Sequence, residues 1–345
     1  MSVANTGHRS ATSLVRAGPE PALVDLDEAG RLAAGPGAPR ISVIICTYDQ
    51  ARWEYLREAV DSVSVQTLPA WETLVVVDHN AGLLARLRAE FPTVRAVASE
   101  AVRGASGARN TGAAHAHGDW LAFLDDDAVA EPGWLAGLLA HRDDPAVLGV
   151  GGRVLPLWHR RRPGWFPDEF AWVVGASYRG LPAQGGPVRN VWSENMLVSR
   201  AVFDAVGGFR AGFGKTGTRS APEDTELCLR ARQAFPTREW RYEPDAIVGH
   251  RVPAERSSFG FFLRRCYSEG RGKAALLRLL PGAQGMSAEM RHAGALPAAV
   301  AREALAWARG DASGLGRAAS IVAGLMMVAA GLGVGLAAGF WRSRS

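Results

Sequence analysis

The chain has 345 residues, of which 48% are hydrophobic, and a formal net charge of +5. That length accommodates one large α/β domain with additional segments, or two domains. The basic excess is modest and forms no dense stripe interleaved with aromatic side chains. It therefore argues against nucleic-acid binding and indicates a preference for a membrane surface or for phosphate. The cysteines Cys46, Cys228 and Cys266 are far apart and show no CxxC spacing, which argues for a reducing compartment and against a structural zinc site or a disulfide framework.

Residues 1–38 contain no apolar segment of the kind found in signal peptides and are rich in Gly, Ala, Pro and Ser. We expect them to form a mostly disordered leader. From residue 39 onward, short apolar runs alternate with segments in which apolar residues follow helical spacing. The expected strands are residues 41–45, 73–77, 94–98, 120–124 and 147–154. Continuous apolar strands separated by helices predict an α/β fold with a mostly parallel sheet between helices, whose ligands bind beyond the carboxyl ends of the strands.

Beyond about residue 155 the pattern is less regular, although residues 191–199 are expected to form a strand. Residues 207–221 contain five glycines and no hydrophobic periodicity, so we expect a mobile loop there. A helix is expected at 222–235. Glu223 and Asp224 lie at its positively polarised start, which favours acidic side chains.

The C-terminal part divides into two segments. In residues 256–317, and above all in 259–280, aromatic and aliphatic residues mix with arginines, which is typical of an amphipathic helix at a membrane interface. Helices that close off the preceding domain explain the same pattern equally well. Residues 318–340 carry no charge, and about 20 apolar residues span a bilayer, so we expect one transmembrane helix. The alternatives are a buried core helix and a re-entrant hairpin broken at 331–333.

Three adjacent carboxylates follow the expected strand at 120–124: Asp125, Asp126 and Asp127. Carboxylates placed together at the mouth of a buried strand repel one another. A Mg²⁺ or Mn²⁺ ion holding a diphosphate would offset that repulsion, because both cations prefer oxygen ligands. A solvated acidic turn is the simpler alternative.

Other polar groups follow the same sheet pattern. Asp78 directly follows the strand at 73–77 and can accept hydrogen bonds from a base or a ribose. Arg103 and Arg109 flank small residues, which let backbone approach a ligand while guanidinium groups bind phosphate. Glu223 and Asp224 can place a base beside a substrate. Each motif also has a simpler interpretation. Asp78 can be an ordinary aspartate at a strand end, the segment from Arg103 to Arg109 a flexible loop, and Glu223-Asp224 a solvated helix start. Residues 209–216 end in Gly-Lys-Thr, but Phe209 stands where a P-loop requires Gly, so we reject an NTPase.

Taken together in chain order, these motifs resemble those of family 2 inverting glycosyltransferases of the GT-A fold. The resemblance covers about residues 39–255 and rests on five elements. These are the opening strand at 41–45 with Thr47 and Tyr48, the second strand with Asp78, the segment 106–110 around Arg109, the D-x-D pattern at 125–127, and the acidic pair Glu223-Asp224. Two departures stand out: His79-Asn80 replaces the usual polar pair after Asp78, and the Gln-x-x-Arg-Trp motif of processive synthases is absent from the sequence.

The resemblance implies a role for each matching residue. The sugar nucleotide would be bound by Thr47, Tyr48, Asp78, Arg103, Arg109, Asp125 and Asp126. A Mg²⁺ or Mn²⁺ ion would be held by Asp127, with Asp125 and His250 as further ligands. Asp224 would act as general base, and Glu223 would orient it or the acceptor.

The expected function is therefore metal-dependent, inverting transfer of a sugar from a nucleotide-diphosphate sugar to a lipid-linked or cell-envelope glycan acceptor. The expected partners are the donor, the acceptor and a membrane, with no nucleic acid. Because sugar nucleotides are made in the cytosol, we expect a cytoplasmic catalytic domain anchored in the cell membrane by a single C-terminal pass. A sugar-nucleotide pyrophosphorylase is disfavoured because Thr47 to Gln50 replaces its Gly-rich opening. A non-catalytic membrane-anchored scaffold that binds sugar nucleotides is the alternative in a different class.

Overall fold

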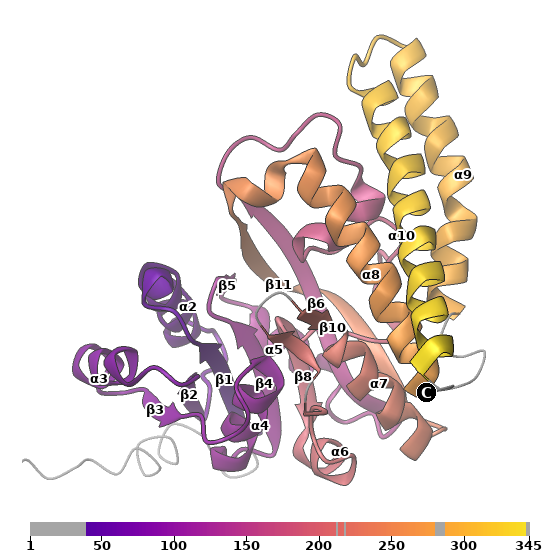
Figure 1. The fold of residues 1–345 in the computed structure, drawn as a ribbon. Coiled ribbons are helices and arrows are strands. Elements are labelled where there is room, and N and C mark those ends of the chain that lie inside the picture. Colours follow the sequence, from indigo (N-terminus) through magenta and orange to yellow (C-terminus); the bar gives the residue numbers. More distant parts are fainter. Residues whose placement is uncertain (1–38, 212, 217–218, 280–286, 343–345) are drawn as a thin grey trace, which may run out of the picture.

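The computed structural model describes residues 39–211, 213–216, 219–279 and 287–342. The expected leader at 1–38 lies outside the described residues. Figure 1 shows a central twisted sheet with helices around it and a group of long helices beside it. The strands are β1 Ile41–Thr47, β2 Glu72–Val77, β3 Arg95–Ala98, β4 Trp120–Asp125, β5 Ala128–Ala130, β6 Val147–Trp158, β7 Gly186–Val188, β8 Asn195–Ser199 and β11 Glu239–Val252.

The sheet has two halves with different strand directions. Strands β3, β2, β1 and β4 are neighbours in that order and are all parallel. Next to β4, the order continues through β8, β6, β11 and β5. Strand β8 is antiparallel to both β4 and β6, whereas β6 and β11 are parallel to each other. The α/β fold class is confirmed, but the sheet is mixed rather than mostly parallel, because β8 enters between β4 and β6 in the opposite direction.

Helices cover both faces of the sheet, as continuous apolar strands require. One hydrophobic core joins the sheet to α2 Trp53–Ser64, α3 Ala81–Glu90 and α5 Trp134–Leu138. The other core joins it to α4 Ala105–His115, α6 Arg200–Ala205 and α7 Glu223–Ala234. Helix α4 approaches β1 so closely that a Cβ at Gly112 would collide with Ile44. Short 3₁₀ helices lie at η1 Gln50–Arg52, η2 Leu139–His141, η3 Asp168–Val174 and η4 Ala254–Ser257.

Two local expectations need correction. The segment 207–221 is not simply a loop, because β9 Gly214–Thr216 and β10 Arg219–Ala221 form a two-stranded antiparallel sheet within it. Each strand has only three residues, which is too short for an alternating pattern to be recognised in the sequence. The strand expected at 191–199 begins only at Asn195. Val191 instead packs in the core around α4, α6 and α7, and residues 192–194 line a cavity.

The C-terminal helices are α8 Phe259–Leu279, α9 Ser287–Ala308 and α10 Gly314–Arg342. Helix α8 buries Phe262 and Cys266 in a third hydrophobic core that also includes Phe166 and Phe170. Helix α10 packs directly on α8, where Gly331 lies so close to Tyr267 that no Cβ would fit. Of the two interpretations of this segment, the structure therefore contains the helices that close off the preceding domain. Helix α8 lies between the sheet and the α9–α10 pair (Figure 1).

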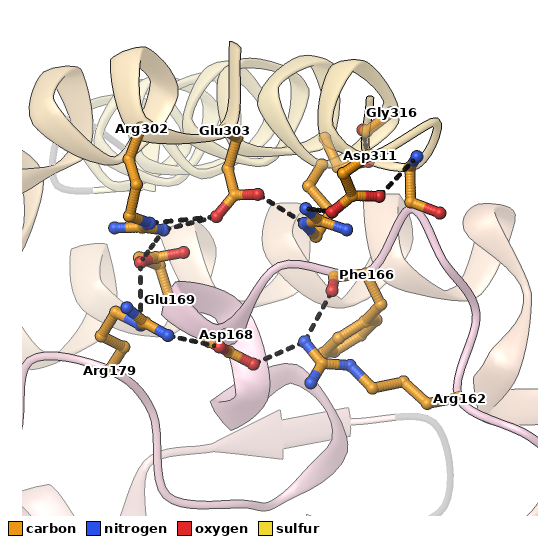
Figure 2. Close-up of polar contacts among 12 residues, drawn as sticks. Arg162, Phe166, Asp168, Glu169, Arg179, Arg302, Glu303, Asp311 and Gly316 are labelled. Atoms are coloured by element: carbon orange, nitrogen blue, oxygen red, sulfur yellow. Dashed lines mark hydrogen bonds and ion pairs between the residues drawn. The ribbon is translucent and has the colours of Figure 1, made fainter. Parts of the chain in front are cut away.

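A chain of ion pairs ties α9 and α10 to η3 (Figure 2). Arg302 of α9 pairs with Glu169 of η3 and with Glu303, and Glu303 in turn pairs with Arg317 of α10. In the same network, Asp168 of η3 forms ion pairs with Arg162 and Arg179. Because several charges share partners, this network orients the helices more firmly than isolated surface pairs would.

Helix α10 is long and apolar enough to cross a membrane: within its segment Gly314–Ala338, an 18-residue window has a mean hydropathy of 2.2, and 22% of that window is buried. It continues through residues 331–333 without a break, so the re-entrant hairpin expected as an alternative there is wrong. The apolar side chains that it exposes include Val322, Leu325, Met326, Val334 and Leu336.

Candidate active site

The three carboxylates at the carboxyl end of β4 pair with two different arginines. Asp125 Oδ1 lies 2.8 Å from Nη2 of Arg109. Asp126 Oδ1 lies 2.9 Å from Nη2 of Arg52, which also pairs with Asp127. Burial raises the pKa of Asp126 to about 7, against the opposing charge of Arg52. The protein thus offsets part of the repulsion within this triplet with its own cations.

Arg109 links the end of β4 to the start of α7. Its buried guanidinium donates from Nη2 to Asp125 and from Nη1 to Glu223 Oε1, at 3.0 Å for the latter. Helix α4, which carries Arg109, is fixed by Asn110: its Nδ2 donates to the carbonyl of Phe209 at 2.7 Å, and its Oδ1 accepts from the Phe209 N–H at 2.8 Å. Arg109 therefore holds two of the expected site carboxylates in place, and its role at a phosphate stays a prediction.

Asp127 and His250 lie together because β5 and β11 are paired. His250 is opposite Ala128 in that pair, and its Nε2 lies 3.5 Å from Asp127 Oδ1. The opposite ring nitrogen, Nδ1, lies 3.1 Å from the carbonyl of Val174, a contact that fixes the ring orientation. Burial opposes the ionisation of Asp127, but the hydrogen bond and charge of His250, together with Arg52, lower its pKa. Burial likewise opposes protonation of His250, yet Glu194 and Asp127 raise its pKa to about 9.

This pair fits one side of a divalent-cation site. A carboxylate oxygen and an imidazole nitrogen are suitable ligands for Mn²⁺, and the hydrogen bond at Nδ1 is the usual support of a metal-binding histidine. Glu194 Oε2 is 4.0 Å from His250 Nε2. Within the described ranges, however, no three His, Cys, Asp or Glu side chains converge into a group that could hold a metal by themselves. Asp125 is paired with Arg109, and its place in the expected ligand set of Asp127, Asp125 and His250 stays a prediction.

The acidic pair at the start of α7 lies beside a cavity. Glu223 is held by Arg109, whereas Asp224 Oδ1 is buried and receives no hydrogen bond from any described residue. Burial and the charge of Glu223 raise the pKa of Asp224 to about 7, although Arg109 opposes the shift. A carboxylate with a free oxygen and a pKa near neutrality suits a general base.

The cavity has a volume of about 160 Å³ and brings together distant parts of the chain. Its lining residues are Arg109, Asp125, Trp172, Gly175, Trp192, Ser193, Glu194, Glu223, Asp224 and Arg265. Glu194 is enclosed, and burial raises its pKa to about 8 against the charge of His250. The walls therefore combine carboxyl groups, two guanidinium groups and two indoles, a composition that suits a polar ligand with apolar faces.

The residues expected at the nucleotide lie at the carboxyl ends of β1 and β2. Asp78 is buried; its Oδ2 accepts from the Gly104 N–H at 2.9 Å, and its Oδ1 lies 2.6 Å from His79 Nδ1. Thr47 is buried at the end of β1, and Tyr48 is half exposed next to it. Arg103 is exposed just before Gly104. The fold thus gathers Thr47, Tyr48, Asp78 and Arg103 at one sheet edge, where their contacts with a nucleotide stay predictions.

Sequence reasoning missed Arg52 and six residues of the cavity lining: Trp172, Gly175, Trp192, Ser193, Glu194 and Arg265. Arg52 follows the turn after β1, and nothing in its spacing points to Asp126 and Asp127. Glu194 lies immediately before β8, inside the strand that the sequence predicts at 191–199. Trp172 and Arg265 come from η3 and α8, so only tertiary packing brings them to the cavity. The adjacent Trp192-Ser193-Glu194-Asn195 was the one signal available, because polar residues interrupt an otherwise apolar segment.

Comparison with known proteins shows the family of this chain. The model of the family described as "Glycosyl transferase family 2" matches residues 42–207. A glucosyl-dolichyl phosphate glucuronosyltransferase of Haloferax volcanii is 34% identical over 249 residues, which are 71% of this chain and 79% of the relative. The chain belongs to glycosyl transferase family 2. The succinoglycan biosynthesis protein ExoM of Rhizobium meliloti is also similar, with 28% identity covering 69% of this glycosyltransferase and 75% of ExoM.

A solved structure supports the fold of this glycosyltransferase. The mannosyltransferase PcManGT from Pyrobaculum calidifontis, in complex with GDP-Man and Mn²⁺, superposes with a TM-score of 0.52 at 20% identity. The match covers 84% of this chain and 86% of the mannosyltransferase. The expected GT-A fold is therefore confirmed. The protein is an enzyme, a glycosyltransferase, as the named relatives of the family indicate.

Proposed function

We propose that this glycosyltransferase moves a sugar from a nucleotide-diphosphate sugar to a hydroxyl or phosphate of a lipid-linked or cell-envelope glycan acceptor, with inversion at the anomeric carbon. The observation that carries the proposal is Asp224, whose free carboxylate oxygen lies beside a cavity bounded by Asp125 and Glu223. The donor would lie over the carboxyl ends of β1, β2 and β4, and the acceptor would enter the cavity from the side of Trp192.

In this proposal Asp224 takes the proton from the attacking acceptor hydroxyl. The acceptor oxygen forms a bond to the anomeric carbon while the bond from that carbon to the diphosphate breaks on the opposite face. A single base and one displacement invert the anomeric centre. Glu223, held by Arg109 at 3.0 Å, would orient the acceptor and keep Arg109 in place between α7 and β4.

Asp127 and His250 are the residues proposed to hold Mg²⁺ or Mn²⁺, with Asp125 as a further candidate. When bound, such an ion would neutralise the charge of the leaving diphosphate. The diphosphate oxygens and water would complete the ligands, because the described protein groups provide too few by themselves. Arg52, paired with Asp126 and Asp127, would help to hold these carboxylates in position.

The proposed acceptor is lipid-linked because the helices beside the cavity have an apolar outer surface. Helix α10 exposes Met326 and Val334 among other apolar side chains. The named relative from Haloferax volcanii is a transferase whose name specifies a glucosyl-dolichyl phosphate. We propose three functional parts: a catalytic domain at 39–255, an interfacial helical segment at 256–317, and a membrane anchor at 318–340 that keeps the catalytic domain cytoplasmic.

The donor can be tested with the full-length protein in nonionic detergent. Sugar nucleotides are screened by the shift that each causes in the melting temperature, with Mn²⁺ and with EDTA. We expect one donor class to stabilise the protein only with the metal, since ligands that bind the folded state raise its stability. No shift with any nucleotide sugar, in either condition, would contradict the proposal.

Membrane attachment has a separate test. Met326→Asp places a charge on the exposed face of α10, and should move protein from the membrane fraction to the soluble fraction. Asp204→Asn, an exposed change on α6, is the control and should leave the distribution unchanged. Equal membrane recovery of both variants would contradict anchoring through this face.

A further inference from the structure

Arg265 lines the cavity, but among the described residues it forms no ion pair with the carboxylates proposed for catalysis. It reaches the cavity from α8, outside the proposed catalytic domain. The other guanidinium in the lining, Arg109, is bound to both Asp125 and Glu223. Among the described residues, none of the carboxyl groups lining the cavity lies within ion-pair distance of Arg265; its ion pair is with Glu269, one turn further along α8. Neutralising the catalytic acids therefore does not explain its position.

Some N–H donors of the Arg265 guanidinium have no acceptor among the described residues. Its Nη1 donates to Glu269 Oε2 at 3.0 Å, and it lies over the Trp172 ring, 5.9 Å from the centroid. Within the described part of the chain, its Nε and Nη2 donate no hydrogen bond to protein, and the side chain is 34% exposed. A guanidinium has five N–H donors in a planar fork that matches two oxygens of a phosphate or carboxylate.

A row of charges along α8 fixes Arg265. Glu269 is shared between Arg265 and Lys273, each at 3.0 Å, and Lys273 also pairs with Glu289 of α9 at 2.5 Å. Lys273 is buried, so this row is part of the contact between α8 and α9. Glu269 and Lys273 act as positioning residues: they hold the guanidinium at the cavity wall and reduce the entropy lost when it binds an anion.

The surroundings of Arg265 suit an acceptor that combines a sugar, a phosphate and a lipid. Trp172 and Trp192 offer flat apolar surfaces in the same cavity as Asp224. Helix α8 packs along α10, where Gly270 contacts the backbone at Val328. Helix α8 thus contributes Arg265 to the cavity and lies between the sheet and the apolar α9–α10 pair (Figure 1).

We propose that Arg265 binds the phosphate that joins the acceptor to its lipid, so that the cavity selects phosphate-bearing lipid acceptors. This inference rests on the proposed function, which it extends by naming the acceptor class and the residue that recognises it. The phosphate is held at the α8 wall, and the sugar or hydroxyl attached to it reaches toward Asp224.

The test measures acceptor binding without any sugar nucleotide. Farnesyl phosphate and farnesol, which share one chain, are titrated calorimetrically into full-length protein in nonionic detergent micelles. We expect wild-type protein to bind farnesyl phosphate at least about tenfold more tightly than farnesol. Arg265→Met should weaken farnesyl phosphate binding by about 10- to 100-fold, the range for hydrogen bonds to a charged group, and leave farnesol binding unchanged.

Two further variants make the result specific. Arg264→Met removes the same charge from an exposed neighbouring position outside the cavity lining, and should behave as wild type. Arg265→Lys keeps the charge but loses the fork, and should show a smaller loss than Arg265→Met. Equal losses in Arg264→Met and Arg265→Met, an equal loss for farnesol, or no preference for farnesyl phosphate in wild type would each overturn the proposal. Because no nucleotide is present, these outcomes are independent of the donor screen.

Discussion

Two acidic clusters of this glycosyltransferase differ in how far cationic side chains neutralise their carboxylates. At the carboxyl end of β4, Asp125, Asp126 and Asp127 are each paired with an arginine. Across the cavity, Asp224 keeps an oxygen without a hydrogen-bond donor among the described residues. The pKa of Asp127 is lowered, whereas that of Asp224 is raised to about 7.

The difference suits the two roles proposed for these carboxylates, cation binding by Asp127 and proton transfer by Asp224. A carboxylate that binds a cation must stay ionised, and partners such as His250 and Arg52 ensure this for Asp127. A base must exchange a proton near neutral pH, so enclosure without a strong partner is useful for Asp224. The central member, Asp126, has a raised pKa despite its arginine, because burial and the charges of Asp127 and Asp125 oppose that ion pair.

The largest expected effect is at Asp224, the proposed base. Asp224→Asn preserves shape but cannot accept the proton, so we expect a loss of about 10²-fold or more in the transfer rate with unchanged donor affinity. Transfer assays and donor-induced melting shifts measure the two quantities. Asp204→Asn, at an exposed position of α6, is the matched control. Near-wild-type turnover of Asp224→Asn would move the role of base elsewhere, first to Glu223.

A second prediction addresses the paired cluster. Asp127→Ala should abolish the metal-dependent part of the donor-induced melting shift, because it removes the carboxylate that faces His250. We expect donor affinity in Mn²⁺ to fall by at least about tenfold. Titration with Mn²⁺ at fixed donor concentration checks this. If Asp127→Ala retained wild-type metal dependence, Asp127 would not be a ligand.

The third prediction uses pH. With the pKa of Asp224 at about 7, the fraction of ionised base rises with pH below that value. We expect kcat/KM to increase about tenfold per pH unit from pH 5 to about 6.5, and to level off above pH 7.5. The residual activity of Asp224→Asn should lack this rise. A rise that persists in that variant would assign the titration to another group.

The smallest effects concern stability, and their signs should differ between the clusters. The raised pKa of Asp224 means that the folded state binds its proton more tightly, so this stabilising contribution is present below about pH 4 and is lost as pH rises through 7. Asp127 has a lowered pKa, so its contribution is present above about pH 4 and is lost in acid.

At pH 8 in EDTA we therefore expect Asp224→Asn to melt a few degrees higher than wild type. Asp127→Asn should melt lower, because breaking a buried ion pair costs about 3–5 kcal/mol. Differential scanning calorimetry at pH 8 and pH 5 measures both shifts, and the gain of Asp224→Asn should shrink at pH 5. Shifts of the same sign at pH 8 would contradict the comparison of the two clusters.

The sequence alone determined the parts of this protein that depend on local patterns. Continuous apolar runs gave the strands of the first half, because burial on both faces leaves no polar positions. The order of the motifs gave the family and the GT-A fold, which the comparisons confirm. The absence of charge in 318–340 pointed to the long apolar helix α10.

Only the tertiary structure decided how the site is completed. The antiparallel insertion of β8 between β4 and β6 brings Glu194 to the cavity, and no local pattern encodes strand direction. Arg52 reaches Asp126 and Asp127, and Arg265 reaches the cavity, from segments whose spacing is that of ordinary helices. Ion pairs between residues far apart in sequence leave no periodic signal. A pKa likewise depends on burial and on neighbours that the fold alone assembles.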